Sequence, residues 1–195
     1  MSVAAIVLAA GLGSRFGGAP KMLADFAGKP LVLRVAETAL ASGAEPVIVV
    51  IGHEAEAVAG ALAGLPVTIV RNPDYAEGLS TSLRAGFAAL PPEAEAAAIL
   101  LGDMPRIGTA LIDRLVRAWR DDACPPALVP VHEGQRGNPA ILSRALAPAI
   151  AGLSGDTGAG KLLRGMPGVV EIETDDPAVL RDADTPEELA RMAGE

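Results

Sequence analysis

Two glycines and two basic side chains lie close together near the start of the chain. Gly11, Gly13 and Ser14 are followed by Arg15, and Lys21 comes six residues after that arginine. Glycine lets backbone N–H groups approach a phosphate without interference from a Cβ atom, and Arg and Lys side chains bind the phosphate oxygens. This combination favours a nucleoside triphosphate as the ligand of the segment.

Two other interpretations of the same segment stay open. The order of its glycines, G-x-G-x-x-x-G, is close to the fingerprint of dinucleotide-binding proteins, and Glu54 follows the second predicted strand, where such a site needs an acidic residue. The third interpretation is a plain turn between a strand and a helix, with its charges in solvent.

A second glycine-rich segment runs from Gly155 to Lys161 and has the G-x-x-x-x-G-K spacing of a phosphate-binding P-loop. Leu162 stands where that loop needs a Ser or Thr, and residues 145–153 before it have the spacing of a helix, not of a strand. We therefore interpret the segment as a loop that faces a substrate, with a helix-capping turn as the alternative.

Three aspartates are candidates for a metal site. Asp103 follows an apolar run and Gly102, at the end of a predicted central strand, and Mg²⁺ prefers such carboxylate oxygens together with substrate phosphates. The alternative role for Asp103 is the N-cap of a helix. Asp182 and Asp184 precede Thr185 and Glu188, which have the spacing of a helix capping box. These two aspartates either serve only that helix start or add one ligand to the metal.

Strands and helices alternate along the chain and position these side chains. Apolar runs predict strands at residues 3–10, 47–51, 67–70, 96–101, 128–131, 139–142 and 169–172. Helical spacing predicts helices at residues 31–40 (with Pro30 in the first turn), 54–62, 82–90, 109–121, 145–150 and 186–192. This order is typical of an α/β fold with a mostly parallel sheet and helices on both faces.

Ligands of such sheets bind beyond the carboxyl ends of the strands. This rule selects residues 11–21, 53, 72–82 and 102–105 as the region of the site. The turn at residues 136–139 is either part of a substrate site or a plain hairpin. Since His53 and His132 are far apart, and no base accompanies the hydroxyl groups of residues 80–82, neither zinc chemistry nor a nucleophile–base pair is indicated.

Length and composition exclude several classes of protein. The chain has 195 residues and a mean hydropathy of +0.36, which predicts one folded domain over residues 1–195. Its net charge of −8 argues against a nucleic-acid partner, and Cys124 is the only cysteine, so an internal disulfide is excluded. Because a basic leader and an apolar run of ~18–20 residues are both absent, we expect a soluble, cytoplasmic protein without a membrane partner.

Six motifs between residues 8 and 189 resemble those of the MobA-like nucleotidyltransferases. They are Leu8-Ala9-Ala10-Gly11 with Arg15 and Pro20-Lys21, Gly78-Leu79-Ser80-Thr81-Ser82-Leu83, Gly102-Asp103-Met104-Pro105, Gly137-Asn138-Pro139, Gly155-Asp156-Thr157-Gly158-Ala159 and Asp182-Ala183-Asp184-Thr185-Pro186-Glu187. The chain is most similar to the molybdenum cofactor cytidylyltransferases. Guanylyl-transferring members usually have glycine and aspartate at the positions of Ala10 and Pro20.

The resemblance implies a Rossmann-like sheet of the nucleotide-diphospho-sugar transferase type. It also implies transfer of CMP from CTP to the terminal phosphate of molybdenum-molybdopterin, with release of pyrophosphate. Arg15, Lys21 and Asp103 would be catalytic, and Mg²⁺ would be the cofactor, held by Asp103 and Asp184. CTP would bind to Leu8, Ala9, Ala10, Gly11, Gly13, Ser14, Arg15, Lys21, Gly78, Ser82 and Asp103, and the acceptor to Gly137, Asn138, Pro139, Asp156, Gly158 and Lys161. The molybdoenzyme that receives the cofactor is a further implied partner.

One position departs from the cytidylyl pattern, in which an arginine usually follows Gly158-Ala159. Gly160 stands there, and Lys161 comes next. A lysine offers a single point charge where an arginine offers a bidentate fork, so other acceptors, such as a sugar or polyol phosphate, stay open. Transfer from GTP, a non-catalytic carrier of a nucleotide or cofactor, and a dehydrogenase are the remaining alternatives.

Overall fold

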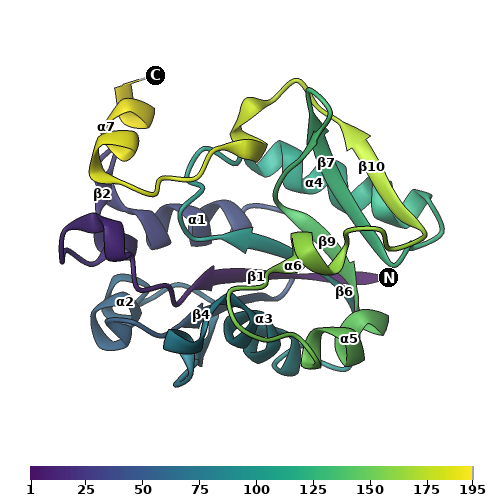
Figure 1. Cartoon of the computed structure of the whole chain (residues 1–195), viewed down its shortest axis with the longest axis horizontal. Helices are drawn as coiled ribbons and strands as arrows, with labels where there is room; N and C mark the ends of the chain where they lie inside the picture. The colour runs from purple at the N-terminus through teal and green to yellow at the C-terminus, as the bar shows by residue number, and fades with distance from the viewer. Residues whose placement is uncertain (195) are drawn as a thin grey trace.

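The fold is built around one eight-stranded sheet in a computed structural model that describes residues 1–194. The strand order is β10-β7-β9-β6-β1-β4-β5, and β8 pairs with β7 (Figure 1). The strands are β1 (Ser2–Ala9), β4 (Val47–Ile51), β5 (Thr68–Arg71), β6 (Ala94–Leu101), β7 (Ala127–His132), β8 (Gln135–Arg136), β9 (Ala140–Ser143) and β10 (Val169–Glu173). β1 is parallel to β4 and β6, and β9 is antiparallel to β6 and β7. With β4–β5 and β7–β10 also parallel, the sheet is mostly parallel, as predicted.

Helices cover both faces of the sheet. The side chains of residues 3–10 point alternately to the two faces, and each face has its own core cluster. The odd-numbered residues 3–9 belong to a cluster with α1 (Leu31–Leu40), α2 (Ala55–Ala61) and α4 (Thr109–Asp121). The even-numbered residues 4–10 belong to a cluster with α3 (Leu79–Ala88) and α5 (Ala147–Ala151). No helix within residues 1–194 is long and apolar enough to cross a membrane.

The structure departs from the predicted elements in three places. A small hairpin, β2 (Asp25–Phe26) and β3 (Lys29–Pro30), precedes α1, so Pro30 ends a strand and does not lie in the first turn of the helix. α3 begins at Leu79 instead of residue 82, because Gly78 makes the turn before it with a φ of 113°. β9 pairs with both β7 and β6, and β8, a strand that was not predicted, forms the hairpin with β7.

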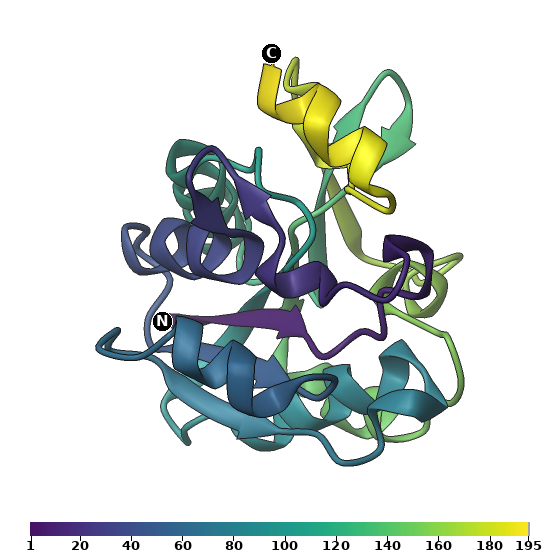
Figure 2. The ribbon, with the colours of Figure 1, turned by 90° about the vertical axis from the view of Figure 1, so that its left-hand side faces the viewer.

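A small third core cluster joins residues 16–31 to the C-terminal helix, and the ribbon of that helix lies near the β2–β3 hairpin (Figure 2). Phe16, from the glycine-rich segment, packs with Phe26 of β2 and with Leu189 and Met192 of α7 (Pro186–Gly194). Ala183 belongs to the same cluster. The cluster therefore holds the segment before α7 against the first loop (residues 11–21). Both segments carry predicted site residues.

Candidate active site

A cleft of about 590 Å³ opens beyond the carboxyl ends of β1 and β6, where a ligand was expected. Most of the residues predicted to bind the nucleotide and the metal line it. They are Leu8, Ala10, Gly11, Gly13, Ser14, Lys21, Gly78, Ser82, Asp103 and Asp184, joined by Asp156. The fold thus brings together side chains from the first loop, α3, the end of β6 and the segment before α7.

A buried lysine with two carboxylate partners marks one end of the cleft. Lys21 Nζ lies 2.6 Å from Asp103 Oδ2 and 3.0 Å from Asp184 Oδ1, and its side chain is 8% exposed. Burial alone would lower the pKa of Lys21, but the charge of Asp103 and the hydrogen bonds to both carboxylates outweigh it and raise the pKa. Lys21 is therefore a fixed positive charge at neutral pH.

Asp184 also pairs with Arg15, whose side chain is mostly exposed. Burial would raise the pKa of Asp184, but the bond to Lys21 and the charge of Arg15 outweigh burial and lower it. The ionised form of Asp184 therefore dominates at neutral pH. The first loop and the C-terminal segment are joined by these two ion pairs in addition to the third core cluster.

Three carboxylates lie close enough together to bind one cation. Asp103, Asp182 and Asp184 each offer an oxygen within 4.8 Å of the others. Asp103 Oδ1 is buried and has no hydrogen-bond partner within residues 1–194. Burial raises the pKa of Asp182, and the like charges of Asp103 and Asp184 raise it further. A divalent cation with a preference for hard oxygen ligands fits this arrangement, because it would both satisfy the orphaned oxygen and offset the repulsion.

Hydrogen bonds at the start of α7 position the C-terminal carboxylates. Thr185 Oγ1 accepts from the N–H of Glu188 at 3.2 Å, and Glu188 Oε2 accepts from the N–H groups of Asp184 and Thr185 at 2.9 and 3.1 Å. The N–H of Ala183 donates to the carbonyl of Asp103 at 2.9 Å. Capping and metal binding are therefore not alternatives here: Thr185 and Glu188 cap the helix, and the carboxylates of Asp182 and Asp184 line the cleft.

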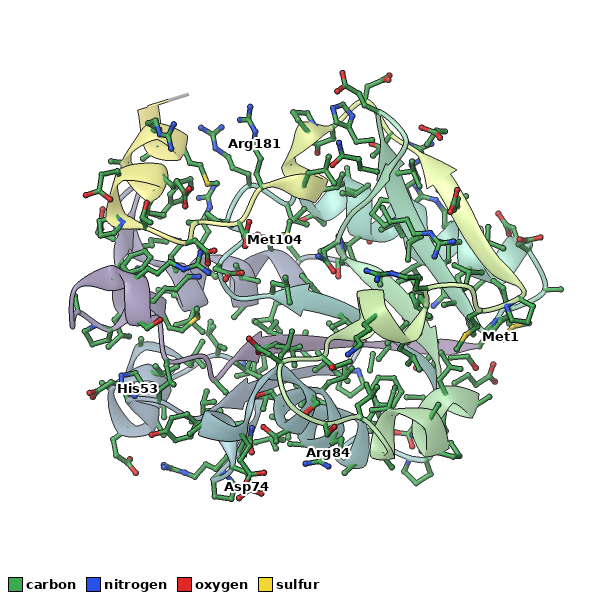
Figure 3. All side chains as sticks on the ribbon, viewed as in Figure 1. Met1, His53, Asp74, Arg84, Met104 and Arg181 are labelled. Carbon is green, nitrogen blue, oxygen red and sulfur yellow. The ribbon has the colours of Figure 1, made fainter. Side chains whose placement is uncertain are left out.

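The two segments that carry the carboxylates also lie side by side in Figure 3. Met104, which follows Asp103, is seen just below Arg181, which precedes Asp182. Met104 and Asp182 line one small cavity, in agreement with this view.

The first loop does not lead directly into an α-helix. Gly13 has a φ of 59°, and a Cβ atom there would lie 2.6 Å from Cβ of Lys21, so glycine lets the lysine pack beneath the loop. Two short 3-10 turns and the β2–β3 hairpin follow, and the first α-helix begins only at Leu31. A dinucleotide fingerprint needs a helix N-terminus at the pyrophosphate. Glu54 does not line the cleft either, so the dinucleotide interpretation lacks both of its structural requirements.

The second glycine-rich segment packs on the start of α3. The N–H of Ser80 donates to the carbonyl of Gly155 at 3.2 Å, and Asp156 Oδ1 accepts from the N–H of Leu79 at 3.2 Å. A Cβ atom at Gly78 would collide with the backbone of Gly155. The nearest preceding regular element is α5, and the helix that follows, α6 (Ala159–Leu162), has four residues. The segment is therefore a loop that supports the cleft, and it lacks the strand of a P-loop.

Several residues implied by the resemblance lie outside the cleft. Ala9 is fully buried because its side chain faces the cluster with α1 and α4, and Arg15 reaches the cleft only through Asp184. Gly158, Pro139 and Lys161 line neither the cleft nor the smaller cavities beside it, and Lys161 is exposed.

Gly137 and Asn138 line a second cavity of about 310 Å³ together with two arginines, Arg136 and Arg164. A smaller cavity of about 180 Å³ shares Arg136, Gly137 and Asn138 with the second cavity, and it shares Leu101 and Asp182 with the cleft. These shared walls place the predicted acceptor residues next to the carboxylate end of the cleft.

Tyr75 and Glu77 are the polar cleft residues to which the sequence analysis assigned no role. Both lie on the 3-10 turn before Gly78 and line the cleft. Their only signal in the sequence is their place in the loop region after the third strand. A Cβ atom at Gly52 would lie 2.5 Å from Cβ of Tyr75, so this turn packs closely on the end of β4.

The chain is similar to known proteins over nearly its whole length. Residues 5–172 match the MobA-like NTP transferase domain. The nicotine blue oxidoreductase of Paenarthrobacter nicotinovorans is 34% identical over 97% of this chain and 96% of that protein. The crystal structure of Rv0371c from Mycobacterium tuberculosis H37Rv has a TM-score of 0.85 and 27% identity over 100% of both chains.

Two further solved structures are similar. Rv0371c in complex with manganese has a TM-score of 0.82 and 26% identity, over 100% of this chain and 99% of that one. CMP:2-keto-3-deoxy-manno-octonic acid synthetase in complex with CTP has a TM-score of 0.78 at 20% identity, over 100% of this chain and 98% of that one. The latter likeness concerns the fold, which is the Rossmann-like sheet of nucleotide-diphospho-sugar transferases. With a family match over residues 5–172, the chain belongs to the MobA-like NTP transferase family.

Proposed function

We propose that the protein transfers CMP from CTP to the terminal phosphate of molybdenum-molybdopterin, with release of pyrophosphate. The observation that carries this proposal is the joint placement of Lys21, Asp103, Asp182 and Asp184 at one end of a single cleft, beside the glycine-rich loop. These groups suit a triphosphate with a divalent cation. Ala10 and Pro20, in place of the glycine and aspartate of guanylyl-transferring members, support CTP over GTP.

The residues of the chain have separate tasks in this reaction. Backbone N–H groups of residues 11–14 and the side chains of Arg15 and Lys21 bind the triphosphate. Lys21 exchanges its carboxylate partners for phosphate oxygens and offsets the charge that grows on the departing pyrophosphate. A divalent cation, Mg²⁺ in this proposal, would be held by Asp103, Asp182 and Asp184 and would withdraw charge from the phosphate oxygens.

The chemistry needs no covalent enzyme intermediate. An oxygen of the acceptor's terminal phosphate attacks the α-phosphorus of CTP, and the bond from that phosphorus to the oxygen bridging to the β-phosphate breaks. The bonding electrons leave with pyrophosphate. The attacking phosphate oxygen is already deprotonated, so a general base is not required. Positioning and charge neutralisation account for the catalysis, in keeping with the cluster of fixed charges in the cleft.

The acceptor enters, in this proposal, from the side of Gly137 and Asn138. The two smaller cavities lie there, next to Asp182, and Arg164 has no ion-pair partner within residues 1–194. Arg136 donates to Glu171 at 2.7 Å and to the carbonyl of Leu163 at 3.0 Å, so it braces this wall. Since Gly160 stands where cytidylyltransferases usually have arginine, a sugar or polyol phosphate is the alternative acceptor.

Pyrophosphate release tests the proposal directly. The purified protein is incubated with CTP, Mg²⁺ and molybdenum-molybdopterin, and in parallel with GTP or with sugar phosphates. We expect metal-dependent pyrophosphate release with CTP, and release only in the presence of a phosphorylated acceptor. Binding of CTP without pyrophosphate release from any acceptor would favour a non-catalytic carrier.

An oxidoreductase is the second candidate function. The observation that favours it is the 34% identity with the nicotine blue oxidoreductase over nearly the whole chain. Such an enzyme would transfer a hydride to a dye-like acceptor, and a nicotinamide dinucleotide as the hydride donor would have to bind without the helix N-terminus and the acidic residue of the usual fingerprint. Loss of NAD(P)H absorbance, which reports hydride transfer, distinguishes this activity from pyrophosphate release.

A further inference from the structure

Asn72, which follows β5, has a side-chain amide whose orientation is fixed by its partners. Its Oδ1 accepts from the backbone N–H of Asp74 at 3.0 Å, and that N–H group can only donate. The Nδ2 group must therefore point the other way. It donates to Thr81 Oγ1 at 2.8 Å and to Ser82 Oγ at 3.0 Å, on α3. Asn72, Thr81 and Ser82 are each 4% exposed, so this network is buried.

The two hydroxyl groups that accept from Asn72 differ in whether their own protons have an acceptor in the protein. Thr81 Oγ1 lies 2.9 Å from the carbonyl of Gly78 and 3.1 Å from that of Asp74, so its proton has an acceptor in the protein. Ser82 donates to no group within residues 1–194, and its residue lines the cleft. Asp74, at the lower edge of the molecule in Figure 3, marks the turn that closes the network.

We propose that Asn72 is a positioning residue that orients the Ser82 hydroxyl to donate a hydrogen bond to a carbonyl oxygen of the nucleotide base. A free serine hydroxyl both donates and accepts, and so it reads a carbonyl and an amino group alike. The Asn72 amide occupies one of the two lone pairs of the Ser82 oxygen, so the Ser82 proton points away from Asn72 and is free to bind a carbonyl in the cleft. In the proposed reaction the partner is the carbonyl of cytosine, so the inference rests on the proposed function.

Two substitutions at one position separate this role from a merely structural one. Asn72→Asp keeps the shape and the acceptor for Asp74, but it replaces the donor with an acceptor. At pH 8 the N–H group and the two hydroxyl groups keep this carboxylate ionised, and Ser82 then donates to it instead of to the ligand. Asn72→Ala leaves the Ser82 proton free, although its direction is no longer held.

The readout is the dissociation constant of CTP with Mn²⁺, measured by calorimetry at pH 8. We expect Ser82→Ala and Asn72→Asp each to weaken CTP binding about tenfold, the effect of one lost hydrogen bond. Asn72→Ala should weaken it less than Asn72→Asp does. The double variant Asn72→Asp/Ser82→Ala should bind within about twofold of the weaker single variant, since both changes remove the same bond.

Pyrophosphate with Mn²⁺ serves as the probe without a base, and thermal melting reports the fold. All variants should bind pyrophosphate as the wild type does, and Thr81→Ser, which keeps its hydroxyl, should bind CTP as the wild type does. A structural role alone would make Asn72→Ala the worse variant for both ligands, because truncation orphans more buried groups. That order, or additive losses in the double variant, would overturn the inference.

Failure of the proposed function has a different signature. If wild-type protein binds GTP or another nucleotide in preference to CTP, the same variants are compared with that nucleotide. Non-additive losses of affinity for that nucleotide would support the role of the Asn72–Ser82 pair, and the assignment as a cytidylyltransferase would be wrong. Normal CTP binding by Asn72→Asp would instead refute the pair and leave the proposed function standing.

Discussion

Lys21 joins the first loop to two of the three carboxylates. A buried lysine with partners at 2.6 and 3.0 Å is costly to disturb, since removing the ammonium leaves Asp103 and Asp184 unpaired next to Asp182. The same contact keeps the ammonium charged and close to where phosphates would lie. Its role is thus electrostatic whether or not the ligand is bound.

The two lysines of the glycine-rich segments should behave differently when truncated. Lys21→Ala should lower turnover by about 10²–10³, the typical effect of removing one preorganised charge, and should weaken CTP binding. Lys161→Ala should leave CTP binding nearly unchanged, because Lys161 is exposed and does not line the cleft. Nucleotide titration and steady-state pyrophosphate release measure both effects. A larger loss of CTP affinity in Lys161→Ala would reverse the assignment.

Asp103→Asn tests the metal site with an isosteric change. The variant should fold, since the residue lies in a loop after β6, and it should lose metal-dependent turnover because one carboxylate charge and its free oxygen are gone. Nucleotide binding without metal should persist in part. Asp121→Asn, at the exposed end of α4, is the matched control. Near wild-type turnover in Asp103→Asn would mean that the cation binds elsewhere.

Among the elements, α7 holds the site residue Asp184 through its capping box. Glu188→Ala removes the acceptor for the N–H groups of Asp184 and Thr185. We expect a loss of about 0.5–2 kcal/mol in unfolding free energy, as for other helix caps. We also expect about 10–100-fold weaker Mn²⁺ binding, because the group that orients a ligand is lost.

Glu187→Ala is the control for this prediction, since Glu187 lies in the same exposed first turn and makes none of the capping bonds. Thermal melting and a Mn²⁺ titration measure the two effects. Equal metal affinity in both variants would show that α7 does not position the carboxylates.

Elements with strong local patterns could be predicted from the sequence. The uninterrupted apolar run of β4 and the one-sided apolar face of α4 gave the bounds that the structure has. The β2–β3 hairpin was missed because strands of two residues carry no periodicity. The early start of α3 was missed because it depends on the turn at Gly78, whose backbone packs closely on Gly155, a residue distant in the chain.

In the candidate site, likewise, only the residues with a local signal in the sequence could be predicted. Lys21 and Asp103 have a local signal, a glycine-rich loop and the end of an apolar strand, and the structure pairs them. Asn72 has no such signal, because its role arises only where the end of β5 meets α3. The cooperation of Asp182 with Asp184 likewise depends on the third core cluster, which no sequence spacing reveals.

At the scale of the whole molecule, an acidic chain binds a highly charged anion only through a few placed cations. The net charge is −8, yet the cleft concentrates Lys21, the loop N–H groups and a site for a divalent cation. Metal and nucleotide should therefore stabilise the protein together. Neither alone satisfies both the carboxylates and the phosphates.

Thermal melting with nucleotides and Mg²⁺ tests whether this cleft serves cytidylyl transfer. At ~100 times its dissociation constant, CTP should add about 2.7 kcal/mol of stability and raise Tm by roughly 5–10 °C. GTP and NADPH should raise it less, and removal of the metal with a chelator should reduce the shift with CTP. A Tm shift with GTP or NADPH that equals or exceeds the shift with CTP would contradict the assignment of this cleft to cytidylyl transfer.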